Sequence, residues 1–196
     1  IDIRHEKDIN GVTYPVLDVL DVATKYSAYL LLKNKTPAHV LEVFWDHWAG
    51  THFPPALVSH DLGREFNGEM IAFIEWISAD TKVGPTEAPW MQAQGERHGA
   101  VIGDTTRLAV EETQAVGYEE MKMVCTYAAM AKNRRVDRSG HSARERVYGR
   151  VDRLPGSALD SFLEKEALLC DDLSRQHHLF RRALQFREAV CAAVVR

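Results

Sequence analysis

The chain has few cysteines, and none of them form a recognisable pair. Only Cys125, Cys170 and Cys191 occur among 196 residues, and no two are spaced as Cys-x-x-Cys. This odd and scattered set argues against a disulfide framework or a cysteine zinc site, and favours buried thiols in a reducing compartment. The nine histidines do not change this interpretation, because none has zinc-finger spacing to a pair of cysteines.

The sequence also lacks long hydrophobic runs. No stretch of about 18 apolar residues is present, so we expect no membrane span, and no signal peptide is recognisable. A hydrophobic fraction of 45% and a charged fraction of 27% are typical of a globular protein. The length suits one domain, or one domain with an appendage. Because the chain begins at Ile1 and not at Met, we expect it to be a segment of a longer protein.

Positive charge is not in excess, since the net charge is −4. Phosphate neutralisation needs Lys and Arg, so a uniform basic surface for nucleic acid is excluded. The charge is unevenly distributed, however. Residues 132–153 hold eight Lys or Arg and three Asp or Glu, a local charge of +5 that leaves −9 for the remainder. This segment is suited to face a phosphate backbone, although a solvated basic loop explains it equally well.

The first third of the chain predicts a meander followed by a helix. Residues 2–6 alternate briefly, Asn10-Gly11 predicts a hairpin turn, and β-rich runs at 15–22 and 26–32 predict two further strands. Thr36 and Pro37 predict the start of a helix, which Gly50 is expected to end. An apolar stripe at helical spacing is expected to be core: Val40, Leu41, Phe44, Trp45 and Trp48.

The middle of the chain alternates strands with helices. A short apolar run after Pro54-Pro55 predicts a buried strand that leads into Asp61 and the turn at Gly63. A helix at 69–77 and a fifth strand at 81–83 follow. A loop is expected through residues 90–95, then a helix opening near Glu96 and another at 118–132. This order predicts an α/β fold with a mixed sheet.

Two sequence motifs within this predicted order of strands and helices resemble those of a known protein family. Ser-His-Asp-Leu-Gly-Arg-Glu-Phe at residues 59–66 and Gln-Gly-Glu-Arg at 94–97 resemble the catalytic core of retroviral and retrotransposon integrases. That ribonuclease H-like family is built on an Asp, Asp, Glu triad. Residues 133–155 also look like the segment that retrotransposon integrases carry after the catalytic helix. The resemblance therefore covers residues 2–155 and implies a catalytic core over 1–155, with 156–196 as a helical extension or linker.

The resemblance sharpens the expected fold and site. It implies a ribonuclease H-like, five-stranded mixed sheet, with three antiparallel strands and then two parallel ones, flanked by helices. Asp2, Asp61 and Glu96 would be the catalytic carboxylates and would hold two Mg²⁺ (or Mn²⁺) ions. Asp18 and Asp21 on the second strand are rivals for the first position, and Asp2 is preferred. Taken alone, Asp61 is also explained as a turn residue and Glu96 as a helix-start acid.

The implied activity is metal-dependent cleavage near DNA 3′ ends and their transfer to target DNA, within a retrotransposon polyprotein. DNA would be contacted by a flexible active-site loop and the basic segment, through Gln92, Gln94, Gly95, Arg97, Arg134, Arg135 and Arg138. The resemblance further implies a homo-oligomer, no membrane association, and a nuclear or intracellular location.

One feature of the catalytic helix departs from the family. Retroviral cores carry Lys one and two turns after the catalytic Glu, where this chain has Ala100 and Gly103. Gly99 and Gly103 would each cost the helix about 1 kcal/mol relative to Ala. Two alternative functions follow: a catalytically lapsed or domesticated module that binds DNA or protein, and a related nuclease acting on RNA–DNA hybrids.

Overall fold

The computed structural model describes residues 1–52, 54–60, 63, 66, 68–83 and 89–149. The expected extension at 156–196 lies outside these residues, as do Asp61, Cys170 and Cys191.

The described residues contain five strands, which form the sheet region. β1 (Asp2–Lys7), β2 (Thr13–Leu20) and β3 (Ser27–Leu31) are antiparallel in that order, and the predicted turn uses Gly11 at φ +80°. β4 (Leu57–His60) and β5 (Asp80–Val83) are parallel. In the described residues they form two hydrogen-bonded ladders, which meet where the Ile1 amino group donates to the Ser59 carbonyl at 2.6 Å. The predicted α/β class, with three antiparallel strands followed by two parallel ones, is confirmed.

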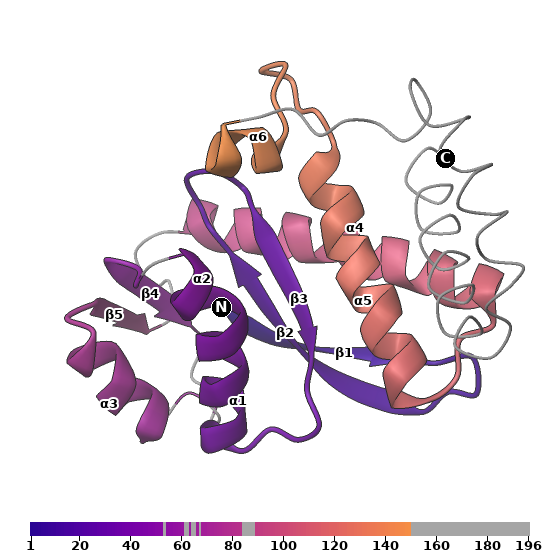
Figure 1. Cartoon of the computed structure of the whole chain (residues 1–196), viewed down its shortest axis with the longest axis horizontal. Coiled ribbons are helices and arrows are strands. Elements are labelled where there is room, and N and C mark those ends of the chain that lie inside the picture. The colour runs from indigo at the N-terminus through magenta and orange to yellow at the C-terminus, as the bar shows by residue number, and fades with distance from the viewer. Residues whose placement is uncertain (53, 61–62, 64–65, 67, 84–88, 150–196) are drawn as a thin grey trace, which may run out of the picture.

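Helices cover both sides of the three-stranded sheet (Figure 1). On one side lie α1 (Pro37–Phe44), the single π-helical turn η1 (Trp45–Ala49), the short α2 (Gly50–His52) and α3 (Glu69–Trp76). On the other side lie α4 (Pro89–Thr113) and α5 (Gly117–Arg134). The short α6 (Ala143–Tyr148) follows them and contacts α5.

The alternation of β2 explains why there are two cores. Neighbouring side chains of a strand point to opposite faces. Leu17 and Val19 therefore pack with α1, α3 and β4, whereas Val16 packs with Tyr29, α4 and α5. Cys125 of α5 is fully buried in the second core, and burial raises the pKa of its thiol. For this cysteine the prediction of a buried thiol is confirmed.

Two details of the first helix differ from the prediction. Gly50 does not end it, because Gly50 has right-handed helical backbone (φ −70°) and the chain continues into α2. Glycine ends a helix by adopting positive φ, which does not happen here. Trp45 is 41% exposed and not core. It lies at the edge of the α1–α3 contact, where its ring meets Phe73 edge-on at 5.6 Å between centroids.

A buried carboxylate anchors the first hairpin. Asp8 accepts hydrogen bonds from the backbone N–H groups of Asn10 and Val12 at 3.0 and 2.9 Å, and from the Tyr14 hydroxyl at 3.2 Å. It also accepts from the N–H of Gly117, the first residue of α5, at 3.3 Å. This side chain thus joins the hairpin to a helix that begins 109 positions later.

Within the described segments, no helix combines the length and the apolar character needed to cross a bilayer.

Candidate active site

The helix that carries Glu96 begins earlier than predicted. α4 starts at Pro89, so Gln92, Gln94 and Gly95 belong to a helix and not to a flexible loop. The proline explains the difference, because its fixed φ and missing N–H suit the first turn of a helix. From the sequence alone, Pro89 is predicted to belong to a loop.

α4 lies unusually close to β1, and two glycines permit this approach. A Cβ on Gly99 would lie 2.0 Å from Cζ of Arg4, and a Cβ on Gly103 would lie 3.4 Å from Oε1 of Glu6. Gly99 therefore provides the space into which the Arg4 guanidinium packs. The two glycines, interpreted from sequence as a cost to the helix, are sites of close packing between helix and strand.

These two contacts define how strand and helix are aligned. Arg4 and Glu6 are two residues apart on β1, and their partners Gly99 and Gly103 are four residues apart on α4. The two distances agree, since two residues of a strand advance about 6.6 Å and four residues of a helix advance about 6 Å. A groove runs between the two elements, and it is bordered by Asp2 of β1 and by Gly99, Ala100 and Gly103 of α4.

The start of β1 also meets the end of β4. The hydrogen bond from the Ile1 amino group to the Ser59 carbonyl places Asp2 next to the last residues of β4. β4 ends at His60, and Asp61 is the next residue in the sequence. Asp2 therefore lies at the same end of the sheet as the end of β4, whereas Asp61 is outside the described residues and Glu96 is an exposed residue of α4. Among the described residues, no three His, Cys, Asp or Glu side chains meet as a metal site.

Ion pairs distinguish Asp2 from its two rivals. Asp18, opposite Asp2 on β2, is 7% exposed and accepts from Nε of Arg4 at 3.0 Å. Burial raises the pKa of Asp18, while Arg4 opposes this shift. Asp21 accepts from Ala23 and Thr24 and closes the turn after β2. Asp2 is 47% exposed and lies 3.6 Å from Nη2 of Arg4, so its carboxylate is more accessible than that of Asp18 and, unlike that of Asp21, does not close a turn.

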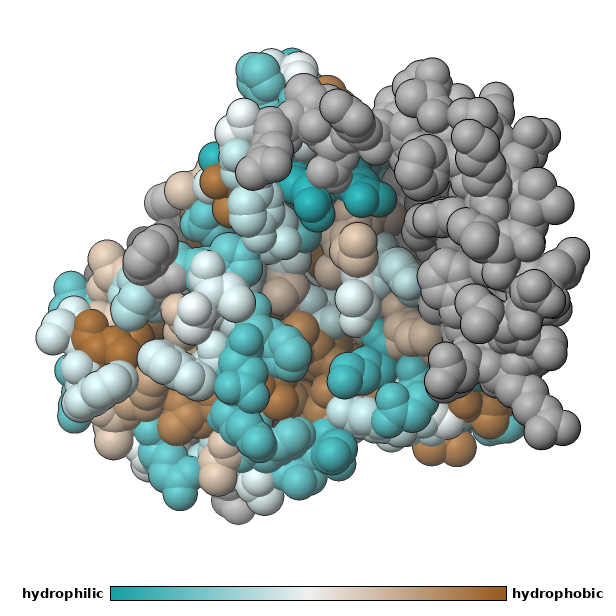
Figure 2. Space-filling view, viewed as in Figure 1, coloured by the Kyte–Doolittle hydropathy of each residue, from teal (hydrophilic) through white to brown (hydrophobic). Residues whose placement is uncertain are grey.

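Three of the arginines predicted to contact DNA line one cavity on the other side of α4. Arg97, Arg135 and Arg138 border a pocket of about 810 Å³, whereas Arg134 is not among its lining residues. We call it the basic pocket, and its other cations are Lys25, Lys132 and Arg146. Figure 2 shows hydrophilic surface over the loop that follows α5, at the top of the view.

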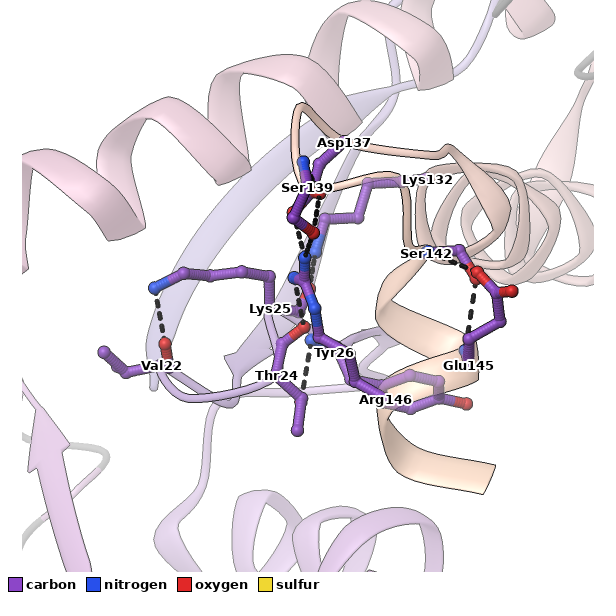
Figure 3. Close-up of polar contacts among 10 residues, drawn as sticks. All are labelled: Val22, Thr24, Lys25, Tyr26, Lys132, Asp137, Ser139, Ser142, Glu145 and Arg146. Atoms are coloured by element: carbon purple, nitrogen blue, oxygen red, sulfur yellow. Dashed lines mark hydrogen bonds and ion pairs between the residues drawn. The ribbon is translucent and has the colours of Figure 1, made fainter. Parts of the chain in front are cut away.

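Two cations hold the walls of the basic pocket together (Figure 3). Arg146 of α6 donates to the Thr24 carbonyl at 3.3 Å, to Ser139 Oγ at 2.6 Å and to the Asp137 carboxylate. Lys132 of α5 donates to the Lys25 carbonyl and to Ser27 Oγ, the latter at 2.5 Å. Burial, together with Lys25, lowers the pKa of Lys132 to about 8.

His98 also lines the basic pocket, and its pKa is lowered by its surroundings. Burial is the main cause that lowers its pKa to about 4, and Lys132, Lys25 and Arg97 lower it further. His98 is therefore neutral at physiological pH and adds no charge. The sequence could have indicated the start of α6, because Ser142 and Glu145 match a capping box. No local signal marked Lys25 or Lys132, since their roles depend on contacts between segments far apart in the chain.

The chain is similar to known proteins in structure and not in sequence. Neither a protein-family model nor a curated protein sequence matches this chain. The catalytic core domain of HTLV-2 integrase in complex with magnesium, in its trimeric form, matches with a TM-score of 0.62 and 14% identity. That match covers 75% of this chain and 93% of the integrase chain.

Two further integrase structures agree with this match. The catalytic core domain of BIV integrase has a TM-score of 0.59 and 15% identity, with coverage of 76% of this chain and 92% of that one. A chain of the simian T-cell lymphotropic virus intasome, in complex with the PP2A regulatory subunit B56 gamma, has a TM-score of 0.63 and 15% identity. Here the coverage is 79% of this chain and 54% of that one.

Proposed function

Because the chain has the fold of a retroviral integrase catalytic core, we propose that it is the catalytic core of a retrotransposon integrase. In this proposal it cleaves DNA near 3′ ends and transfers them to target DNA, acts as a homo-oligomer, and works in the nucleus or elsewhere inside the cell. The observation that carries the proposal is the shared fold, in which Asp2 begins β1 beside the end of β4, the strand that leads into Asp61.

The three residues proposed for the site suit a hard divalent cation. Asp2 and Glu96 are carboxylates from different elements, and Asp61 would add a third, which is the oxygen ligand set that Mg²⁺ prefers. Mg²⁺ held by these carboxylates would supply Lewis-acid activation of the attacking oxygen and charge stabilisation of the leaving one. The chain itself supplies the packing around Asp2: Gly99 of α4 leaves space for the side chain of Arg4 of β1, and Arg4 pairs with Asp18 of β2.

A titration with Mn²⁺ tests the metal site without requiring activity. We expect isothermal calorimetry to detect weak binding that is lost in Asp2→Asn, Asp61→Asn and Glu96→Gln. Asp46→Asn is the matched control, because Asp46 is an exposed carboxylate on η1. Equal binding by all of these variants would rule out the proposed ligands.

An oligonucleotide assay tests the reaction. With Mg²⁺ or Mn²⁺, the wild type should join labelled 3′ ends to a target duplex, and Asp61→Asn should lower the yield to background. Metal binding without joining would support the first alternative, a lapsed or domesticated binding module. One observation favours that alternative: Arg4 already lies 3.6 Å from Asp2 and partly neutralises it. Cleavage of RNA–DNA hybrids in place of joining would support the nuclease alternative.

A further inference from the structure

A groove lined by aromatic side chains lies between α1 and α3, on the side of the sheet opposite α4 and α5 (Figure 1). Its volume is about 400 Å³, and we call it the aromatic groove. The residues that line it are Ala38, Leu41, Glu42, Trp45, Phe73 and Trp76. Its three rings contact one another in series, since the ring centroids of Trp45 and Phe73 are 5.6 Å apart and those of Phe73 and Trp76 are 6.0 Å apart.

The two tryptophans of the aromatic groove are exposed. Trp76 is 74% exposed and Trp45 is 41% exposed. Exposed apolar side chains that gather in one patch mark an interaction site, whereas single scattered ones do not. The ring of Phe73 also meets the buried Phe44 edge-on, at 6.4 Å between centroids, so the patch is fixed to the core. A ligand would find these rings already positioned, which reduces the entropic cost of binding.

The surroundings of the aromatic groove are acidic. The helical elements α1, η1, α2 and α3 contain four acidic residues and no Lys or Arg. The four acids are all exposed, and they are Glu42, Asp46, Glu69 and Glu75. Only Glu42 has a histidine beside it, His39 at 3.0 Å, among the ion pairs of the described residues. A complementary partner therefore combines an apolar face with positive charge.

The sequence of residues 179–196 has this combination, and it lies outside the described residues. Apolar side chains recur there at intervals of three or four positions, which predicts one apolar face of a helix. They are Leu179, Ala183, Phe186, Val190 and Val194. Residues 175–196 contain five Arg and one Glu, a local charge of +4. An amphipathic helix that lays its apolar face in a hydrophobic groove is a recurring mode of recognition.

The last described residues lie close to the helices that carry the aromatic groove. The Tyr148 hydroxyl of α6 is 3.1 Å from Nε2 of His52, and Gly149 follows it. His52 lies seven residues after Trp45 along consecutive helical elements, a distance of about 10 Å. Residues 150–178 are 29 in number and can span up to roughly 100 Å. Docking within one chain is thus within reach, and such a tether gives an effective concentration of about millimolar.

We propose that residues 179–196 form an amphipathic helix that docks in the aromatic groove of the same chain. Its apolar face would cover Trp45, Phe73 and Trp76, and its arginines would lie beside the acidic residues of α1, η1 and α3. This inference goes beyond the proposed function and does not depend on it, because the aromatic groove contains none of the proposed metal ligands.

Fluorine NMR of the full chain labelled with 5-fluorotryptophan tests the proposal. Single Trp→Phe variants assign the resonances of Trp45, Trp48 and Trp76. The apolar-face variant Phe186→Asp/Val190→Asp places two charges on the predicted docking face. We expect it to shift the Trp45 and Trp76 resonances and to increase the broadening of Trp76 by a soluble gadolinium chelate about twofold or more, because water is no longer excluded from the ring. Trp48 is 7% exposed, and its unchanged resonance would show that the fold is intact.

Gln185→Asp/Ala189→Asp is the matched polar-face control. It adds the same two side chains at the same spacing, but one position earlier, which is about 100° around a helix and on the predicted polar face. Its Trp45 and Trp76 resonances should match those of the wild type.

Three outcomes would overturn the proposal. The first is a Trp76 resonance that is identical in the wild type and the apolar-face variant. The second is an equal change in the apolar-face variant and the polar-face control. The third is gadolinium broadening of Trp76 that decreases as the protein concentration is raised about tenfold, because docking within one chain is independent of concentration. That result would assign the aromatic groove to a second copy of the chain.

Discussion

The roles of two glycines of α4 depend on the residues that they contact in the folded protein. Gly99 and Gly103 are four residues apart, so they lie on the same face of the helix, and this face meets Arg4 and Glu6 of β1. Without side chains at these positions, the helix approaches the strand closely. The Arg4 guanidinium fills the space at Gly99 and makes the ion pair with the buried Asp18 carboxylate at 3.0 Å.

We predict that Gly99→Ala lowers the free energy of unfolding by about 1–2 kcal/mol. Alanine would ordinarily stabilise a helix by about 1 kcal/mol relative to glycine, but here its Cβ displaces Arg4 from the buried Asp18. Urea denaturation followed by circular dichroism measures the change. Gly95→Ala is the control, because a Cβ at Gly95 meets nothing within 4 Å, and it should be neutral or stabilising.

A double variant tests the cause of the predicted loss. If Gly99→Ala acts by displacing Arg4, then in an Arg4→Ala background the same substitution should be neutral or stabilising. An equal loss in both backgrounds would contradict this explanation.

At the scale of elements, α6 is a short helix whose start is firmly defined. Ser142 Oγ accepts from the N–H of Glu145 at 3.1 Å, and the Glu145 carboxylate accepts from the N–H of Ser142 at 2.5 Å. These reciprocal bonds form a capping box, and Gly149 closes the helix in the left-handed conformation. Because α6 carries Arg146, this cap also positions the contact that braces the basic pocket.

We predict that Ser142→Ala lowers the free energy of unfolding by about 1 kcal/mol, because the N–H of Glu145 loses its acceptor. Ser142→Thr keeps the hydroxyl and should retain most of the stability. Thermal and urea melts of the two variants measure the difference. Identical losses for alanine and threonine would show that packing at this buried position, and not the cap, dominates.

Most elements of this fold could be predicted from the sequence to within a few residues. The turn at Gly11 and Pro37 at the start of α1 are local signals that lie where they are predicted, and α5 (Gly117–Arg134) matches the helix predicted at 118–132 to within two residues at each end. The predicted start of α4 is wrong by several residues, because a proline such as Pro89 is compatible both with a loop and with the first turn of a helix. Helix ends were less predictable, since Gly50 ends a helix only if its φ becomes positive.

At the scale of the whole molecule, α5 and the strand β3 are joined by buried polar groups. The Asn133 amide accepts from the N–H of Ser27 at 2.9 Å and donates to its carbonyl at 2.7 Å, so it pairs with the start of β3 as another strand would. Lys132 adds bonds to the Lys25 carbonyl and to Ser27 Oγ. These contacts link segments more than 100 positions apart and close the sheet against α5.

We predict that stability depends on the protonation of Lys132. Its pKa falls from 10.5 in the unfolded chain to about 8 in the folded one, chiefly through burial. Between these values the unfolded chain binds more protons, so the contribution of Lys132 to stability rises with pH; below about pH 8 both states are charged and it is constant. The difference in unfolding free energy between wild type and Lys132→Met should therefore rise by about 1–2 kcal/mol from pH 8 to pH 10.

Urea denaturation at one-unit pH steps measures this dependence. Lys122→Met is the control, because Lys122 is an exposed residue of the same helix, and its difference from wild type should not change over this range. Parallel curves for the two variants would contradict a lowered pKa at Lys132.

The sequence by itself determined the order of strands and helices, the α/β class and the run that leads into Asp61. These depend on periodicity and turn chemistry, which act over a few residues. Only the tertiary structure decided that Asp18 is buried against Arg4 while Asp2 is half exposed, that Gly99 makes room for Arg4, and that six cations line one pocket. The reason is physical: strand register and helix packing bring distant segments together, and no local pattern encodes which side chain each residue will meet.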